Sequence, residues 1–265
     1  MTTLAHSFDD ALGYEQFMGR WSRPLSQEFL RWLSVPAKMK WLDVGCGTGI
    51  FTKTVLDTCC PTTVVGVDCA RAQIDHARQS VDDRRAKFHV ADARKLPASD
   101  ASFDVVASVL AINFVPDRSR ALAEMRRVVR PNGLIGGCVW DFSAELSPSW
   151  PIRVGMSRVG VAAPPIIGTE VSSLDALVSL YKQAGLRDVE AISIEVTTSF
   201  ESFDELWHTL TPGYAPLTKA IAQMSENTQA RLLDIVRAEL PPTAGGNIAY
   251  SARANAVRVL SPLDS

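Results

Sequence analysis

Several runs of apolar residues in the first half of the chain lack a regular alternation with polar residues. Such runs are typical of strands that are buried on both faces, as in parallel sheets. They occupy positions 41–44, 64–67, 105–110 and 134–140. Segments with a helical spacing of apolar residues separate these runs, at 50–58, 72–82 and 118–129. Strands that alternate with helices predict an α/β fold with a doubly wound, mostly parallel sheet.

The second half of the chain shows a different pattern. Ile192, Ile194 and Val196 alternate with polar residues, and the alanines within 251–256 do the same. This alternation predicts strands at a margin of the sheet, where one face is more polar. Between these strands lies a longer segment, and we expect it to form a helical insertion over 201–240.

Capping signals locate two further helical segments. Ser22 precedes an apolar stretch with helical spacing, so residues 1–35 are expected to form an N-terminal helical cap whose helix starts at Ser22. Ser202 and Glu205 have the spacing of a capping box, which marks the start of the insertion. We therefore expect one domain over 1–265, in which the insertion either packs on the sheet or covers a substrate pocket.

Composition narrows the classes of function. The 265 residues include 27 Lys and Arg against 29 Asp and Glu, and a net charge of −2 gives no nucleic-acid footprint. The five cysteines and four histidines lack the spacing of a metal site. The N-terminus has no secretory signal pattern, and no apolar run reaches the roughly 18 to 20 residues of a membrane span. We expect a cytoplasmic protein without a metal, nucleic-acid or membrane partner, and its oligomeric state stays open.

The most informative segment is Trp-Leu-Asp-Val-Gly-Cys-Gly-Thr-Gly at positions 41–49. A strand, a glycine-rich loop and a helix in this order form the nucleotide pocket of open α/β sheets. Asp43 would repel a phosphate at this place, whereas it suits a cofactor that carries an ammonium group. A dinucleotide-binding loop with the pattern G-x-G-x-x-G is the alternative, although its third glycine would fall on Ile50.

The loop resembles motif I of the class I S-adenosylmethionine-dependent methyltransferases, in particular the small-molecule, ubiquinone-biosynthesis-like group (methyltransferase type 11). The string Arg-Pro-Asn-Gly at 130–133 also matches that family. The resemblance implies a seven-stranded, Rossmann-like sheet with an antiparallel last strand. It also implies S-adenosylmethionine as the cofactor and in-line methyl transfer to a small, largely apolar or aromatic molecule. An NAD-dependent oxidoreductase and a catalytically silent methyltransferase-like binding protein remain alternatives.

The resemblance also implies which residues bind the cofactor. Asp68 would accept hydrogen bonds from the ribose hydroxyls. Asp92 and the backbone N–H of Ala93 would hold adenine, and the backbone carbonyl at Ser108 would face the methionine ammonium. The full set of expected cofactor-binding residues is Tyr14, Arg20, Asp43, Gly45, Cys46, Gly47, Gly49, Asp68, Cys69, Asp92, Ala93 and Ser108.

Aromatic residues indicate the rest of the pocket. The N-terminal segment resembles those that fold over the cofactor in some small-molecule methyltransferases. Arg20 would pair with the methionine carboxylate, and Tyr14 or Trp21 would lie near the sulfonium. The expected substrate-pocket residues are Trp21, Asn113, Phe114, Trp140 and Trp207. No residue is identified as a catalytic base, although Asp141 is a candidate.

Overall fold

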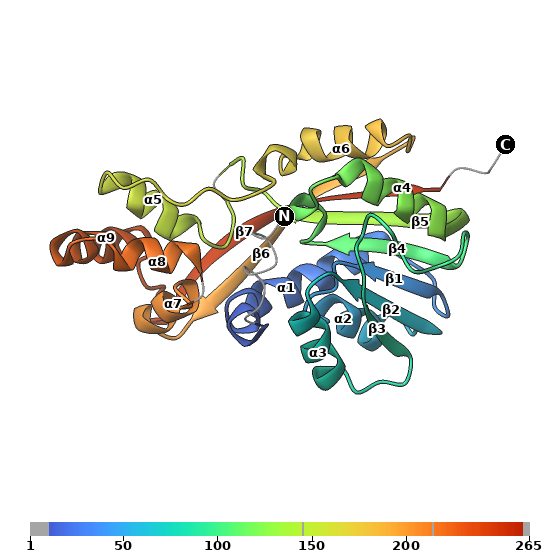
Figure 1. Ribbon diagram of the computed structural model, residues 1–265. Coiled ribbons are helices and arrows are strands. Elements are labelled where there is room, and N and C mark those ends of the chain that lie inside the picture. The colour runs from blue at the N-terminus through green and yellow to red at the C-terminus, as the bar shows by residue number, and fades with distance from the viewer. Residues whose placement is uncertain (1–10, 145, 214, 262–265) are drawn as a thin grey trace.

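The computed structural model describes residues 11–144, 146–213 and 215–261, and strands alternate with helices along the chain (Figure 1). The strands are β1 (Lys40–Val44), β2 (Thr63–Asp68), β3 (Ala86–Val90), β4 (Phe103–Val109), β5 (Val129–Trp140), β6 (Glu190–Phe200) and β7 (Ile248–Leu260). The helices are α1 (Ala11–Leu33), α2 (Ile50–Thr58), α3 (Arg71–Ser80), α4 (Arg118–Val128), α5 (Trp150–Arg158), α6 (Leu174–Gln183), α7 (Phe203–Leu210), α8 (Pro216–Ala222) and α9 (Glu226–Glu239). Short 3-10 turns cover Ile112–Phe114 and Thr169–Val171.

The strands of the described residues form one seven-stranded sheet in the order β3-β2-β1-β4-β5-β7-β6. Strands β1 to β5 pair in parallel, whereas β7 lies antiparallel between β5 and β6. The predicted α/β fold, with a doubly wound, mostly parallel, seven-stranded sheet and an antiparallel last strand, is therefore confirmed. Because the parallel strands point the same way, the loops that follow them meet at one edge of the sheet.

Helices cover both faces of the sheet, because alternate residues of each strand point to opposite sides (Figure 1). Trp41 and Val64 pack on one face with buried residues of α1, α2 and α3. Leu42 and Val106 pack on the other face with buried residues of α4 and α6. This burial on both sides explains why β1, β2 and β4 appear in the sequence as continuous apolar runs.

Helix α1 extends well before Ser22, so the predicted helix start at Ser22 is wrong. Pro24 lies inside the helix, where it has no N–H to donate to the carbonyl of Arg20. The hydroxyl of Thr198 on β6 approaches that carbonyl instead, at 3.5 Å. The helix also buries the whole side chain of Trp21. Tertiary packing therefore supports a helix that continues through Pro24 and begins well before the predicted start at Ser22.

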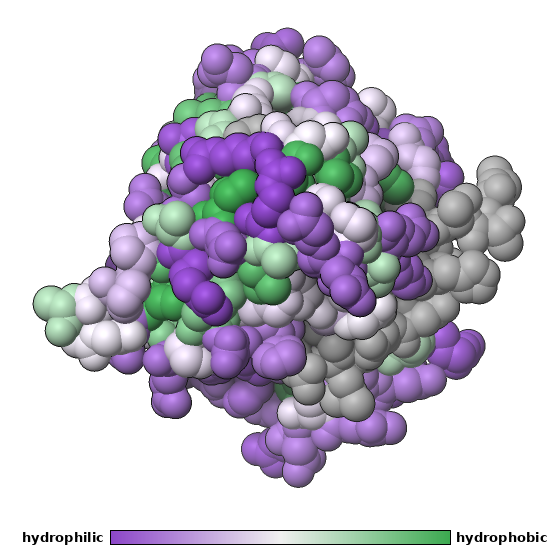
Figure 2. All heavy atoms as spheres, turned by 90° about the vertical axis from the view of Figure 1, so that its left-hand side faces the viewer, coloured by the Kyte–Doolittle hydropathy of each residue, from purple (hydrophilic) through white to green (hydrophobic). Residues whose placement is uncertain are grey.

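The segment between β6 and β7 contains α7, α8 and α9. Ser202 caps α7 by accepting a hydrogen bond from the N–H of Glu205, as its spacing predicts, while the Glu205 carboxylate accepts from the N–H of Glu201. Helix α9 packs on α5 at Gly155, where an added Cβ would lie 2.7 Å from the Leu232 side chain. Figure 2 shows this end of the molecule, with hydrophobic residues gathered near the middle of the face and hydrophilic residues around them.

Candidate active site

A cavity of about 670 Å³ lies at the edge where the parallel strands end. Residues that follow β1, β2, β3 and β4 line it, together with residues of α1, α2 and α3. Ligands of open α/β sheets bind outside these carboxyl ends, so the cavity is the candidate active site. The predicted site residues that line it are Asp43, Gly45, Cys46, Gly47, Asp68, Cys69, Asp92, Ala93 and Phe114.

The glycine loop after β1 is shaped by backbone angles that other residues rarely adopt. The φ angles of Gly45, Gly47 and Gly49 are 78°, 51° and 87°, all in the left-handed region. The N–H groups of Gly45 and Cys46 both donate to the carbonyl of Val67, at 2.8 and 3.0 Å. The loop therefore folds against the end of β2 and presents its backbone to the cavity.

Asp43 is buried at the base of this loop, with 1% of its surface exposed. Its Oδ2 accepts a hydrogen bond of 2.7 Å from the hydroxyl of Thr52 on α2. Its Oδ1 has no hydrogen-bond partner among the described residues. Burial raises the pKa of Asp43 from 3.8 to about 7. A nearby cation would therefore be strongly favoured, because it would stabilise the charged carboxylate and occupy its free oxygen.

Asp68 holds the same loop from the end of β2. Its two carboxylate oxygens accept from the N–H groups of Gly47, at 3.0 Å, and Ala70, at 2.9 Å. Burial raises the pKa of Asp68, although these hydrogen bonds oppose the shift. Each carboxylate oxygen can accept more than one hydrogen bond, so Asp68 can serve the loop and a ligand hydroxyl together.

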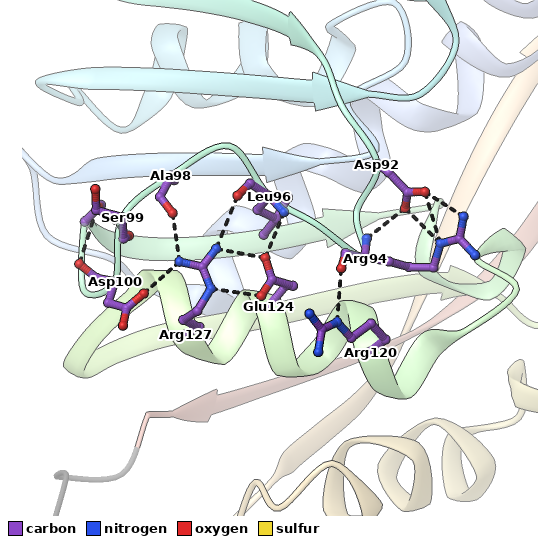
Figure 3. A network of polar contacts seen from close by, with 10 residues as sticks. Asp92, Arg94, Leu96, Ala98, Ser99, Asp100, Arg120, Glu124 and Arg127 are labelled. Atoms are coloured by element: carbon purple, nitrogen blue, oxygen red, sulfur yellow. Dashed lines mark hydrogen bonds and ion pairs between the residues drawn. The ribbon is translucent and has the colours of Figure 1, made fainter.

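Asp92 lies beyond β3 and faces Arg94, which forks both carboxylate oxygens at 2.6 to 3.1 Å (Figure 3). This hydrogen bonding to Arg94 lowers the pKa of Asp92, which is therefore charged at neutral pH. The predicted acid is thus present in the cavity as an acceptor, beside a cation that the sequence analysis did not identify.

Helix α4 supports the segment that follows Asp92 (Figure 3). The Glu124 carboxylate accepts from the N–H of Leu96 at 2.8 Å. Arg127 donates to Glu124 and to the carbonyls of Leu96 and Ala98, and it also pairs with Asp100. Through these contacts Arg127 ties α4 to the 96–100 segment.

Several predicted cofactor residues do not line the cavity. Arg20 pairs with Glu205, donates to the carbonyl of Ser199 at 3.4 Å, and lies over the Phe200 ring. The side chain of Tyr14 lies outside the described residues. The two remaining residues, Gly49 and Ser108, lie next to residues that do line it.

Of the aromatic residues predicted to line the substrate pocket, some lie in the hydrophobic core instead of the cavity. Trp21 and Trp140 are buried and meet edge to face, with ring centroids 6.4 Å apart. Trp207 stacks on Phe203, its neighbour on α7. None of these residues lines the cavity, and neither does any other described residue of the insertion. Phe114 is therefore the one predicted substrate-pocket residue that lines the cavity.

An apolar part of the cavity extends past the end of β4. Val109, Leu110 and Phe114 line it together with Ile167, which is 51% exposed. Asn113 is buried beside them, and its carbonyl accepts from Arg118 at 2.7 Å. This part of the cavity suits an apolar molecule.

Asp141 is held by partners that reduce its basicity. Its carboxylate accepts from the Ser143 hydroxyl at 2.6 Å and pairs with Arg253 at 2.8 Å. Burial alone would raise the pKa of Asp141, but these hydrogen bonds hold it below its usual value. The side chain also does not line the cavity, so the structure gives no support to Asp141 as a base.

The structure adds lining residues that the sequence analysis missed. Ser22 of α1 and Thr48 of the glycine loop line the cavity, as do Arg94 and Ile167. Thr48 stands inside the motif and could have been noticed there. Ser22 reaches the cavity only through the packing of α1, for which the local sequence carries no signal.

The residues that the structure describes lack two features, a metal-binding cluster and a membrane-spanning helix. These residues contain no group of three or more His, Cys, Asp and Glu side chains that could hold a metal ion. Within the same residues, no helix has both the length and the apolar character needed to cross a bilayer.

Comparison with known sequences identifies a matching family and several relatives. A family model described as a methyltransferase domain matches residues 42–136. The 27-O-demethylrifamycin SV methyltransferase of Amycolatopsis mediterranei is 32% identical over 63% of this chain, which spans 60% of that protein. The O-methyltransferase cnsE of Penicillium expansum is 30% identical over 71% of this chain and 71% of its own length.

Solved structures share the fold. Phosphoethanolamine N-methyltransferase 2 of Haemonchus contortus, in complex with S-adenosyl-L-methionine, gives a TM-score of 0.57 at 19% identity. The similarity covers 96% of this chain and 57% of that one. Together with the relative that is 30% identical over 71% of both chains, these findings confirm the predicted family. The chain belongs to the class I S-adenosylmethionine-dependent methyltransferases, and S-adenosylmethionine is its cofactor.

Proposed function

We propose that the protein transfers the methyl group of S-adenosylmethionine to a small, largely apolar or aromatic molecule. The main support is the cavity, which joins the glycine loop and three acids to an apolar part lined by Leu110, Phe114 and Ile167. Small-molecule sites are typically apolar with a few well-placed polar groups. The relative from Amycolatopsis, whose name gives a rifamycin derivative as its substrate, fits this class of acceptor.

The residues present fit the cofactor. The unpartnered Oδ1 of Asp43 suits the methionine ammonium, and the glycine loop allows its backbone to approach closely. Asp68 would accept from the ribose hydroxyls in addition to its bonds from Gly47 and Ala70. Asp92 and the N–H of Ala93, which both line the cavity, would hold adenine, and the Asp92 carboxylate would accept from its exocyclic amine.

The chemistry divides between the cofactor and the protein. Bound S-adenosylmethionine would supply a methyl group on a sulfonium, and its sulfur would leave as a neutral thioether when the methyl group passes to the acceptor in line. The protein binds and orients the two reactants, which can account for much of the acceleration of such a reaction. Phe114 and Ile167 would hold the acceptor and exclude water from it. We assign no catalytic base.

We further propose that the protein acts in the cytoplasm and has no nucleic-acid or membrane partner. All five cysteines are free, which suits a reducing compartment. The net charge of −2 provides little attraction for nucleic-acid phosphates.

Two measurements test the proposed function. Calorimetry with S-adenosylhomocysteine and with NAD should show binding of the first ligand alone. A methyl-transfer screen should then find turnover among small hydroxy-aromatics, quinols or amines, with oligonucleotides and peptides as comparison acceptors. Tight binding of NAD without S-adenosylhomocysteine, or turnover limited to oligonucleotides or peptides, would contradict the proposal.

A further inference from the structure

The cavity contains no obvious cationic partner for the carboxylate of the cofactor's methionine part. Arg20, the residue expected from the sequence, pairs with Glu205 and does not line the cavity. Among the described residues that line the cavity, Arg94 is the single residue of the Lys or Arg type, and its guanidinium is paired with Asp92. The donors that remain for the carboxylate among the described lining residues are neutral.

Two buried hydroxyls line the cavity and lack partners. Ser22 is 5% exposed and Thr48 is 3% exposed, and neither hydroxyl has a hydrogen-bond partner within the described part of the chain. Buried polar groups of native proteins are nearly always hydrogen-bonded, so two unpaired hydroxyls in one cavity indicate a ligand with matching groups. Each hydroxyl can donate, which is what a carboxylate requires.

The surroundings of Thr48 place its hydroxyl at the amino-acid end of the cavity, and Ser22 lines the same cavity from α1. Thr48 directly precedes Gly49, the N-cap of α2, and the N-terminal end of a helix favours an anion. Asp43 lines the same cavity and is fixed to α2 through Thr52, which leaves its other oxygen free. An α-amino acid carries its ammonium and its carboxylate on one carbon, so the acceptor and the donors must lie close together.

We propose that Ser22 and Thr48 donate hydrogen bonds to the methionine carboxylate of S-adenosylmethionine, while Asp43 accepts from its ammonium group. This inference rests on the proposed function. It gives α1 a direct part in binding, because Ser22 of α1 lines the cavity. It also assigns Arg20 to the junction between α1 and α7 rather than to the cofactor.

Two ligands that differ only in the amino-acid part provide the test. S-Adenosylhomocysteine has this part, whereas 5′-methylthioadenosine keeps the nucleoside and the sulfur and lacks it. Calorimetry at pH 8 compares wild type with Ser22→Ala and Thr48→Val. Each variant should weaken S-adenosylhomocysteine roughly 10- to 150-fold, the range for hydrogen bonds to charged groups, and leave 5′-methylthioadenosine within about twofold of wild type.

Matched variants control for packing. Thr54→Val removes a buried hydroxyl of α2 that already donates to the carbonyl of Ile50 at 2.8 Å, and Arg20→Ala removes the alternative cation. Neither should change the affinity for either ligand. Urea unfolding of ligand-free Ser22→Ala and Thr48→Val should show no loss of stability, because the hydroxyls that they remove make no hydrogen bond in the fold.

The outcomes separate this inference from the proposed function. Wild-type affinity for S-adenosylhomocysteine in both variants would refute the inference alone, as would an equal loss for the two ligands. A large loss of affinity for S-adenosylhomocysteine in Arg20→Ala would refute the inference and identify Arg20 as the partner of the carboxylate. Failure of wild type to bind either ligand would refute the proposed function, and the inference with it.

Discussion

Replacing Gly45 by alanine tests whether the loops after β1 and β4 are as closely packed as the structure shows. The new Cβ would lie 2.3 Å from the Cβ of Ala111, well inside the 3.4–4 Å of ordinary contact. The φ of 78° adds a cost of about 1–2 kcal/mol for any residue with a side chain. Overpacking typically costs about 1–3 kcal/mol more, so the free energy of unfolding should fall by about 2–5 kcal/mol.

Gly160 provides the matched control for this variant. Its φ is 80°, yet an added Cβ would have no neighbour within 4 Å, so Gly160→Ala carries the backbone cost alone. Urea unfolding should therefore place Gly45→Ala about 1–3 kcal/mol below Gly160→Ala. The second change Ala111→Gly should restore much of that difference, because it removes the clashing atom. Equal losses in the two single variants, or no recovery in the double variant, would refute the packing argument.

Three further predictions concern the acids and their supports. Because burial raises the pKa of Asp43 to about 7, the fold keeps a proton that the unfolded chain loses near pH 4. The free energy of unfolding without ligand should therefore fall between pH 4 and 7, by up to about 4 kcal/mol, and urea titrations of Asp43→Asn should lack this part of the fall. Asp68→Ala should weaken S-adenosylhomocysteine by about 2–4 kcal/mol in calorimetry, and unchanged affinity in a folded variant would remove Asp68 from the site. Arg127→Ala should release the 96–100 segment, so hydrogen exchange there should increase and affinity for S-adenosylhomocysteine should fall several-fold. Faster exchange without any loss of affinity would show that the segment does not support adenine binding.

The sequence predicted the sheet and the glycine loop because both have local causes. Strands such as β4 are buried on both faces, and this requires continuous apolar runs. The loop requires glycines at positive φ, so Gly45, Gly47 and Gly49 mark it directly. Helices α5 and α6 were not predicted, because their short apolar faces are defined by the elements on which they pack.

The contents of the site were harder to predict than its position. Asp43, Asp68 and Asp92 follow strands whose ends meet, so their approach to one cavity follows from the fold. Ser22 shares the cavity only because α1 continues past Pro24 and lies against the sheet. Whether Arg20 reaches a ligand or pairs with Glu205 depends on a partner that is distant in the sequence, and no local pattern reports such a choice.

Phe200 and Ile248 are paired at the point where the chain leaves the sheet and returns to it, so the segment between them is open to exchange. The chain leaves the sheet after the first of these residues and returns at the second, so the intervening helices join positions that are already neighbours. Such a segment can be lengthened, shortened or exchanged without altering the register of β6 and β7, since loop length adds little to the cost of closure. No described residue of the segment lines the cofactor cavity. Recombination at these two points would therefore give chimeras that keep cofactor affinity, and α1 and α5 are the elements that would need new partners.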